Sequence, residues 1–225
     1  TAAIDRLGPV DELDLIAVPD AMALQRAGGE VDRDAAARVQ AYLIANCAHQ
    51  GNRFAILDAY PGSGVDTVLA QRERIVRGLI EPFDAALYYP WIRTSDNRIE
   101  PPSGHVAGVF ARSDARAGVF KAPANEELFG VLDLENSVDA GIQDQLHPQG
   151  INCLRALPGR GIRVWGARTL NRDPSWRYVN VRRLLLQIRR WIDQNLSPAT
   201  FEPNGPALWV RMQRELETYL GGLWQ

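Results

Sequence analysis

Cysteine, lysine and long apolar runs are scarce in this sequence of 225 residues. The two cysteines, Cys47 and Cys153, match neither a metal-ligand nor a redox spacing, so a disulfide scaffold is excluded and a reducing compartment is expected. No apolar run reaches the ~18 residues that a membrane-spanning helix requires, and membrane insertion is therefore not expected. The first residues lack the basic and then apolar order of a signal peptide.

Acidic and basic residues nearly balance, at 27 against 25, but their distribution is uneven. All the basic residues except Lys121 are arginines, and residues 155–190 hold ten of them with one acid, Asp173. The planar fork of arginine suits bidentate contacts with carboxylates, so the block predicts fixed ion-pair interfaces. A GC-rich genome would produce the same arginine excess without a structural reason, and this alternative stays open.

The first half of the sequence alternates apolar strand-like runs with helix-like segments. Residues 13–18, 53–58 and 85–92 read as strands, and helices are expected between them, the first after N-caps at Asp32 or Asp34. Such an alternation predicts crossover connections and a parallel component in the sheet. The predicted fold class is α/β, a mixed sheet with a parallel component flanked by helices.

The second half predicts a short helix over 105–112, an antiparallel or edge strand at 162–165 and two longer helices. Residues 101–104 are expected to be a loop. The helix over 181–196 carries one apolar face, formed by Val181, Leu184, Leu185, Ile188, Trp191 and Ile192. The last helix begins near Pro206, which suits its first turn.

Catalytic patterns are weak. The loop 61–67 follows a strand and precedes a helix, as a phosphate-binding loop does, but it lacks the Walker lysine, and Pro61 replaces the first glycine of a nucleophile elbow. Asp58 ends the preceding strand without a second placed partner. The three histidines (His49, His105 and His147) lie far apart. We therefore expect no catalytic, cofactor or metal site; the alternative is an α/β enzyme or nucleotide-binding protein that uses Asp58 to Thr67.

The arginine block also contains aromatic residues, as nucleic-acid surfaces do. Trp191 and Trp165, however, are assigned to apolar positions of a helix and a strand. A protein interface is therefore favoured and nucleic acid is an unlikely partner.

Five ordered motifs resemble the contractile tail sheath proteins of phages and related injection systems. They read GVFKAPAN at 118–125, GIN at 150–152, GIRVWGARTL at 161–170, YVNVRRL at 178–184 and FEPN at 201–204. The first half is similar more loosely, through VPD at 18–20 and RFAILD at 53–58. The residues that carry the resemblance are Lys121, Ala122, Pro123, Asn125, Gly161, Trp165, Gly166, Arg168, Thr169, Asn180, Arg183, Pro203 and Asn204.

The resemblance implies a core fragment with a non-catalytic, subtilisin-like sheath domain over 1–117 and an α+β sheath C-terminal domain over 118–225, which form one packed core. It implies a structural subunit, without enzymatic activity or cofactor, that stacks as hexameric rings around an inner tube on a baseplate and contracts. Terminal arms, expected to be missing here, would link subunits by adding strands. The particle would assemble in the bacterial cytoplasm; whether it is a phage tail, a tailocin or an extracellular injection system stays open.

Four arginines are the candidate interface: Arg182, Arg183, Arg189 and Arg190 are expected on or beside the polar face of their helix. We hypothesise that they contact the inner tube or a neighbouring subunit. The alternative is pairing within the subunit, with Glu126, Glu127, Glu215 or Glu217.

Overall fold

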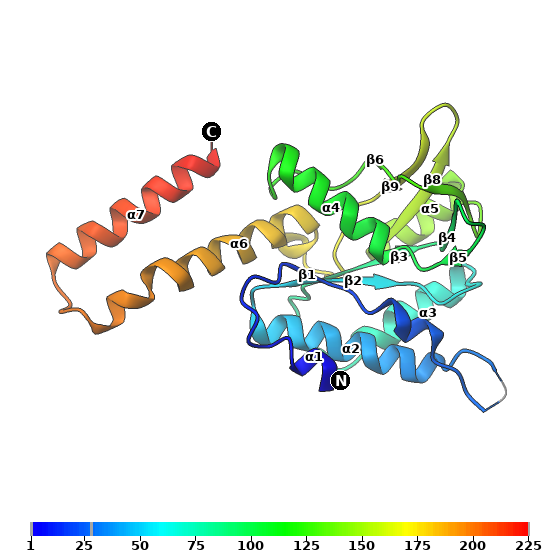
Figure 1. Ribbon diagram of the computed structural model, residues 1–225, viewed down its shortest axis with the longest axis horizontal. Coiled ribbons are helices and arrows are strands. Elements are labelled where there is room, and N and C mark those ends of the chain that lie inside the picture. The colour runs from blue at the N-terminus through cyan, green and yellow to red at the C-terminus, as the bar shows by residue number, and fades with distance from the viewer. Residues whose placement is uncertain (1, 28, 225) are drawn as a thin grey trace. The chain divides into compact units, whose positions relative to one another are not determined.

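The computed structural model describes residues 2–27 and 29–224. The chain separates into two compact units, Thr1–Leu186 and Gln187–Gln225, and each is described by itself. The boundary between them falls inside helix α6 (Val179–Leu196) (Figure 1).

A six-stranded mixed sheet forms the centre of the first unit, in the order β1-β2-β3-β8-β9-β6. Strands β1 to β3 and β8 run parallel, whereas β9 is antiparallel to β8 and β6. The strands are β1 (Leu15–Ile16), β2 (Phe54–Asp58), β3 (Ala85–Tyr89), β8 (Ile151–Leu157), β9 (Gly161–Trp165) and β6 (Glu126–Glu127). The expected mixed sheet with a parallel component is confirmed.

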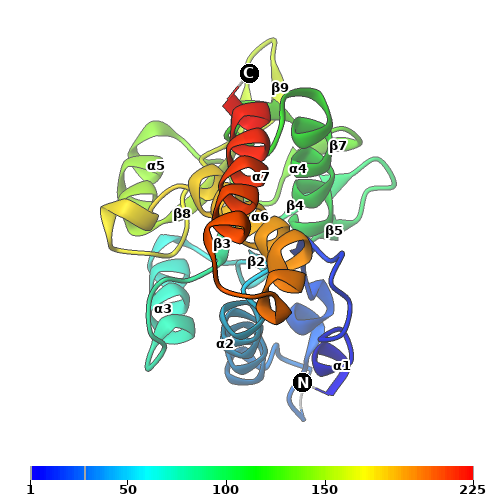
Figure 2. The same cartoon turned by 90° about the vertical axis from the view of Figure 1, so that its left-hand side faces the viewer.

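Helices cover both faces of this sheet (Figure 2). They are α1 (Ala2–Asp5), α2 (Arg33–Gln50), α3 (Val65–Val76), α4 (Ser103–Ala117) and α5 (Ala140–Leu146). Alternate residues of β2 enter two separate cores: Ala55 and Leu57 pack with α2, α3 and α5, whereas Phe54 and Ile56 pack with α4. A strand buried on both faces reads as a continuous apolar run, which is why the sequence predicted β2.

Local signals fix several helix ends. Asp32 caps α2 because its carboxylate accepts hydrogen bonds from the backbone N–H groups of Asp34 and Ala35, as the sequence predicted. Gly51 ends the helix in the left-handed region.

Four predicted elements differ from the structure: two strands, a loop and a helix. The strand predicted at 13–18 contains only the two residues of β1, and that predicted at 85–92 divides, since Pro90 lacks the N–H that would continue β3. The segment 101–104 is not wholly a loop: α4 begins at Ser103, directly after Pro102, and extends to Ala117, beyond the expected helix at both ends.

A smaller three-stranded antiparallel sheet has the order β5-β4-β7. Its strands are β4 (Ile92–Thr94), β5 (Ile99–Glu100) and β7 (Val131–Leu134). Short 3-10 turns complete the first unit: η1 (Pro19–Ala23), η2 (His147–Gln149) and η3 (Pro174–Trp176). Strand β7 follows β6 closely in sequence, but the two strands belong to different sheets.

The second unit is a helical hairpin. It contains the end of α6, the turn η4 (Ser197–Phe201) and α7 (Pro206–Trp224), so the predicted Pro206 start is confirmed. The rings of Trp191 and Tyr219 stack 4.2 Å apart, 4° from parallel. The Asn204 side chain accepts a 2.7 Å hydrogen bond from the Trp209 indole and fixes the turn into α7.

Candidate functional site

The loop after β2 does not form a phosphate site. The N–H of Gly62, which a phosphate would need, already donates to both carboxylate oxygens of Glu135 at 3.1 Å. A carboxylate at that amide repels a phosphate. Ser63 is buried, with 1% of its surface exposed, so its hydroxyl is not available as a nucleophile.

Asp58 is equally inaccessible. It is 3% exposed, and one of its carboxylate oxygens accepts a 2.8 Å hydrogen bond from the backbone N–H of Ser103, the first residue of α4. Burial raises the pKa of Asp58 to about 7, although the hydrogen bonds from Ser103 oppose that rise. The carboxylate holds the start of α4, and Asp58 is therefore not accessible as the acid of the predicted enzyme alternative.

Within the described ranges, no group of three or more His, Cys, Asp or Glu side chains is placed to hold a metal ion. In the same part of the chain, no helix is long and apolar enough to span a membrane.

The GVFKAPAN motif at 118–125 forms ion pairs and hydrogen bonds beside the outer strands β6 and β9. Lys121 pairs with Glu126 at 2.5 Å, and Arg116 contacts the same carboxylate. The N–H of Asn125, a residue in the left-handed region, donates to the Val164 carbonyl at 2.7 Å. Ala122 and Pro123 connect these contacts. The motif therefore attaches β6 to the sheet.

Gly161 and Gly166, at the start of β9 and directly after its end, lie so close to neighbouring side chains that a larger residue would fit only if those side chains moved. A Cβ at Gly161 would lie 2.8 Å from a Glu127 carboxylate oxygen, and one at Gly166 would lie 2.8 Å from the Asn152 side-chain oxygen. Trp165 between them is half-buried, with the Arg160 guanidinium 6.0 Å from its ring.

Asn152 and Asn171 organise the segment after β9. The Asn152 side chain accepts a 2.7 Å hydrogen bond from the Arg168 N–H and donates to the Arg168 carbonyl. Thr169 is buried, and its hydroxyl donates to the Trp176 carbonyl at 2.7 Å and accepts from the Asn171 amide at 2.8 Å. These bonds hold the strand-like segment that leads into α6.

The start of α6 is anchored by two ion pairs. Arg182 contacts Asp84 at 2.5 Å, with both side chains almost buried, and Arg183 forms two hydrogen bonds with Asp114 at 2.9 and 2.5 Å. The guanidinium of Arg183 also lies 4.9 Å from the Phe110 ring. These two arginines serve as internal anchors, with partners other than the four glutamates considered from the sequence.

The predicted face of α6 is wrong in its first turns. Val179 and Leu186 are buried with Arg183, whereas Val181 is 37% and Leu185 is 40% exposed. The ion pair with Asp114 allows an arginine to lie on the buried side of the helix.

The remaining motif and candidate interface residues lie along α6 and in the turn before α7. The Asn180 amide donates to the Phe120 carbonyl at 2.9 Å and so joins the first motif to the helix. Arg189 is exposed, with Asp193 3.9 Å away, and Arg190 is half-buried. Pro203 is exposed in the turn before α7.

Sequence reasoning missed Asp84 and Asp114, the partners of the two anchoring arginines. Each acid lies 69 or more positions from its arginine, and no local spacing marks such a pair. Asn152 lies within the GIN motif, which was the available signal for it.

These contacts define an α/β core in which most motif residues connect strands and helices through hydrogen bonds and ion pairs. A family model described as the phage tail sheath protein central domain matches residues 2–170, and the chain belongs to that family. The prediction of the tail sheath family is thus confirmed.

Two curated relatives and several solved structures agree. The chain is 33% identical over 115 residues to the tail sheath protein of Burkholderia phage BcepMu, and 31% identical over 90 residues to a putative prophage major tail sheath protein of Pseudomonas aeruginosa. These alignments cover 46% and 38% of this chain and 23% of each relative.

The contracted helical sheath of the anti-feeding prophage matches with a TM-score of 0.77 and 34% identity, over 100% of this chain and 58% of that chain. The contracted PVC sheath of an extracellular contractile injection system matches with a TM-score of 0.72 and 34% identity, over 81% of this chain and 52% of that one. The chain thus spans little more than half of these sheath chains. The relatives support a structural sheath role over the enzyme alternative.

Proposed function

We propose that the protein is a structural subunit of a contractile sheath, which polymerises as stacked hexameric rings around an inner tube and contracts to drive the tube through a target envelope. The similarity to a contracted helical sheath over the whole length of this chain is the observation that supports the proposal most. The subunit needs no enzymatic activity, because the work is stored as a free-energy difference between two packings of the same subunits.

Assembly places the subunit on a baseplate, in the bacterial cytoplasm, before the particle acts as a phage tail or an extracellular contractile particle. Similarity to a chain in the anti-feeding prophage baseplate structure, at 36% identity and a TM-score of 0.71 over 86% of this chain and 51% of that chain, supports the baseplate contact. Residues 1–117 act as the subtilisin-like domain and 118–225 as the C-terminal domain. Strand addition by terminal arms links neighbouring subunits.

Among the candidate interface arginines, Arg189 is the best placed for a contact with the tube or a neighbouring subunit, since 57% of its side chain is exposed. Arg182 and Arg183 act indirectly, by anchoring the helix that carries it. Arg189→Glu in the full-length protein is expected to reduce sheath assembly, whereas Arg38→Glu, at another exposed arginine, leaves it unchanged. Normal contractile sheaths from the Arg189 variant would contradict this assignment.

Electron microscopy of the full-length protein tests the function directly. Striated hollow cylinders are expected, with a shorter and wider contracted form. A soluble monomer whose melting temperature rises on addition of nucleotide would instead support the enzyme or nucleotide-binding alternative.

A further inference from the structure

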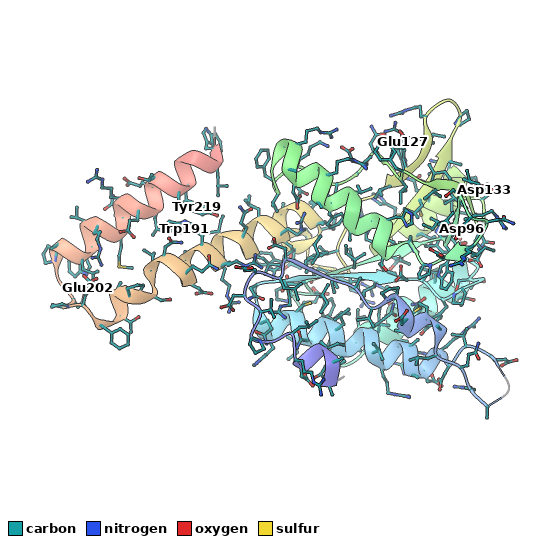
Figure 3. All side chains as sticks on the ribbon, in the orientation of Figure 1. Asp96, Glu127, Asp133, Trp191, Glu202 and Tyr219 are labelled. Atoms are coloured by element: carbon teal, nitrogen blue, oxygen red, sulfur yellow. The ribbon has the colours of Figure 1, made fainter. Side chains whose placement is uncertain are left out.

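A groove runs between the two helices of the second unit. Its volume is about 610 Å³, within the range of protein ligand pockets. Trp191 of α6 and Tyr219 of α7 line it (Figure 3), together with Asn195, Arg211, Arg214, Glu215 and Thr218. We call this surface the α6–α7 groove.

The two arginines of the α6–α7 groove differ in their pairing. Arg211 is held by Glu202 at 2.5 Å and lies 3.8 Å from Glu215. The exposed guanidinium of Arg214 makes no ion pair with any residue in the described part of the chain. The α6–α7 groove therefore combines an aromatic surface with a positive charge that lacks a counterion.

The first unit carries a surface of matching chemistry on β6, on β7 and in the turn that joins them. Phe129 and Leu132 are 63% and 66% exposed, large values for apolar side chains. Two acids flank them in sequence: Glu127, whose side chain is 43% exposed, and Asp133, which is exposed. Both acids are labelled in Figure 3. We call these four residues the β6–β7 ridge.

The acids of the β6–β7 ridge are weakly paired. The Glu127 carboxylate lies 4.0 Å from the nearest nitrogen of Arg163. Within the described residues, the Asp133 carboxylate accepts a hydrogen bond from the backbone N–H of Leu134 and forms no ion pair. The Arg112 guanidinium lies over the Phe129 ring, 4.3 Å from its centre, and holds the ring in place. The ridge thus combines two exposed apolar side chains with two carboxylates.

We propose that the β6–β7 ridge of one copy docks into the α6–α7 groove of a second copy. Phe129 and Leu132 cover the aromatic surface of the groove, and Asp133 supplies the counterion that Arg214 lacks. Charge complementarity of this kind fixes the partner and the register of a contact. The inference rests on the proposed function, because it requires copies of the subunit to meet.

Such a contact is heterologous, since it joins two different surfaces of the same chain. Each copy keeps one free ridge and one free groove, so contacts of this type extend into rings or open helices and do not stop at a dimer. That property suits a sheath subunit.

Disulfide cross-linking in assembled particles of the full-length protein tests the contact. Leu132→Cys and Thr218→Cys place thiols on the ridge and in the groove. The native Cys47 and Cys153 are buried, and burial raises the pKa of each thiol to about 12, so they do not compete.

The double variant is expected to give a ladder of linked chains after oxidation. A mixture of the two single variants should give disulfide-linked dimers. Chains of each single variant alone should remain without a covalent link. Assembled cylinders without a ladder, dimers from one single variant alone, or linkage to a different protein would each overturn the proposal.

Charge reversal supplies a second measurement. Arg214→Glu and Asp133→Arg are each expected to lower the yield of cylinders by roughly tenfold or more, and their combination to restore most of it. Arg38→Glu is the matched control. Cylinders from the unsubstituted protein with no rescue in the combined variant overturn only this contact, whereas a failure of the unsubstituted protein to polymerise removes the proposed function as well.

Discussion

Replacing Asp58 by Asn should change how the stability of the chain depends on pH. The carboxyl is buried at the end of β2, with the Ser103 N–H as its backbone donor. An asparagine oxygen can accept the same bond while the side chain stays neutral at every pH. The substitution therefore removes the ionisation and keeps the shape and the contact with α4.

The magnitude follows from the pKa. Burial raises the pKa of Asp58 from 3.8 to about 7, and each tenfold gain in proton affinity corresponds to ~1.4 kcal/mol. Because the folded state binds the proton more tightly than the unfolded state, its contribution to stability is fully present below pH 3.8 and is lost as pH rises towards 7. The complete loss is about 4 kcal/mol, of which ~2 to 3 kcal/mol falls between pH 5 and pH 8.

Guanidinium unfolding of the chain and of Asp58→Asn at pH 5 and pH 8 measures this change. The difference in unfolding free energy between the two proteins should move in favour of the variant by ~2 to 3 kcal/mol from the lower to the higher pH. Asp11→Asn, at an exposed carboxyl, should give a difference that hardly varies with pH. A constant difference for Asp58→Asn would refute the reasoning that desolvation controls this group.

Two further predictions concern packing. Arg182→Met is expected to lower the unfolding free energy by ~3 to 5 kcal/mol in thermal or denaturant unfolding, because it removes the positive charge that pairs with the buried carboxylate of Asp84. Adding Asp84→Leu should recover most of the loss, and additive losses would contradict this account. Gly150→Ala should lower the unfolding free energy by at least ~1 to 3 kcal/mol, since Gly150 has φ 76° and a Cβ there would lie 2.4 Å from the Thr169 carbonyl oxygen. The control Gly108→Ala, in open space within α4, should raise the unfolding free energy slightly. Equal effects of the two substitutions would rule out the clash.

The parts of the fold that local pattern determines could be predicted. The apolar run that became β2, the Asp32 cap and the alternation at 162–165 each express a constraint within a few residues. Strand β8 was not predicted, because Asn152 and Arg155 interrupt its apolar pattern.

The arginine helix marks the limit of such reasoning. Periodicity placed Arg183 on the polar face, and the structure buries it because Asp114, on another helix, neutralises it. The motifs identified the family, since they record packing requirements such as the contact between Asn180 and the first motif. Arg182 and Arg183 pair within the chain, and Arg189 and Arg190 stay the interface candidates, since a contact with another chain leaves no local pattern in one sequence.

The position of β8 beside β3 has a consequence for synthesis on the ribosome. About sixty residues separate the end of β3 at Tyr89 from the start of β8 at Ile151. At the usual translation rate of ~5 to 20 residues per second, roughly 3 to 12 seconds pass between the synthesis of β3 and that of its neighbour β8. During that time an apolar strand, buried on both faces in the finished protein, presents an open edge to other nascent chains. The yield of folded chain therefore depends on how well this edge is protected while the chain is made.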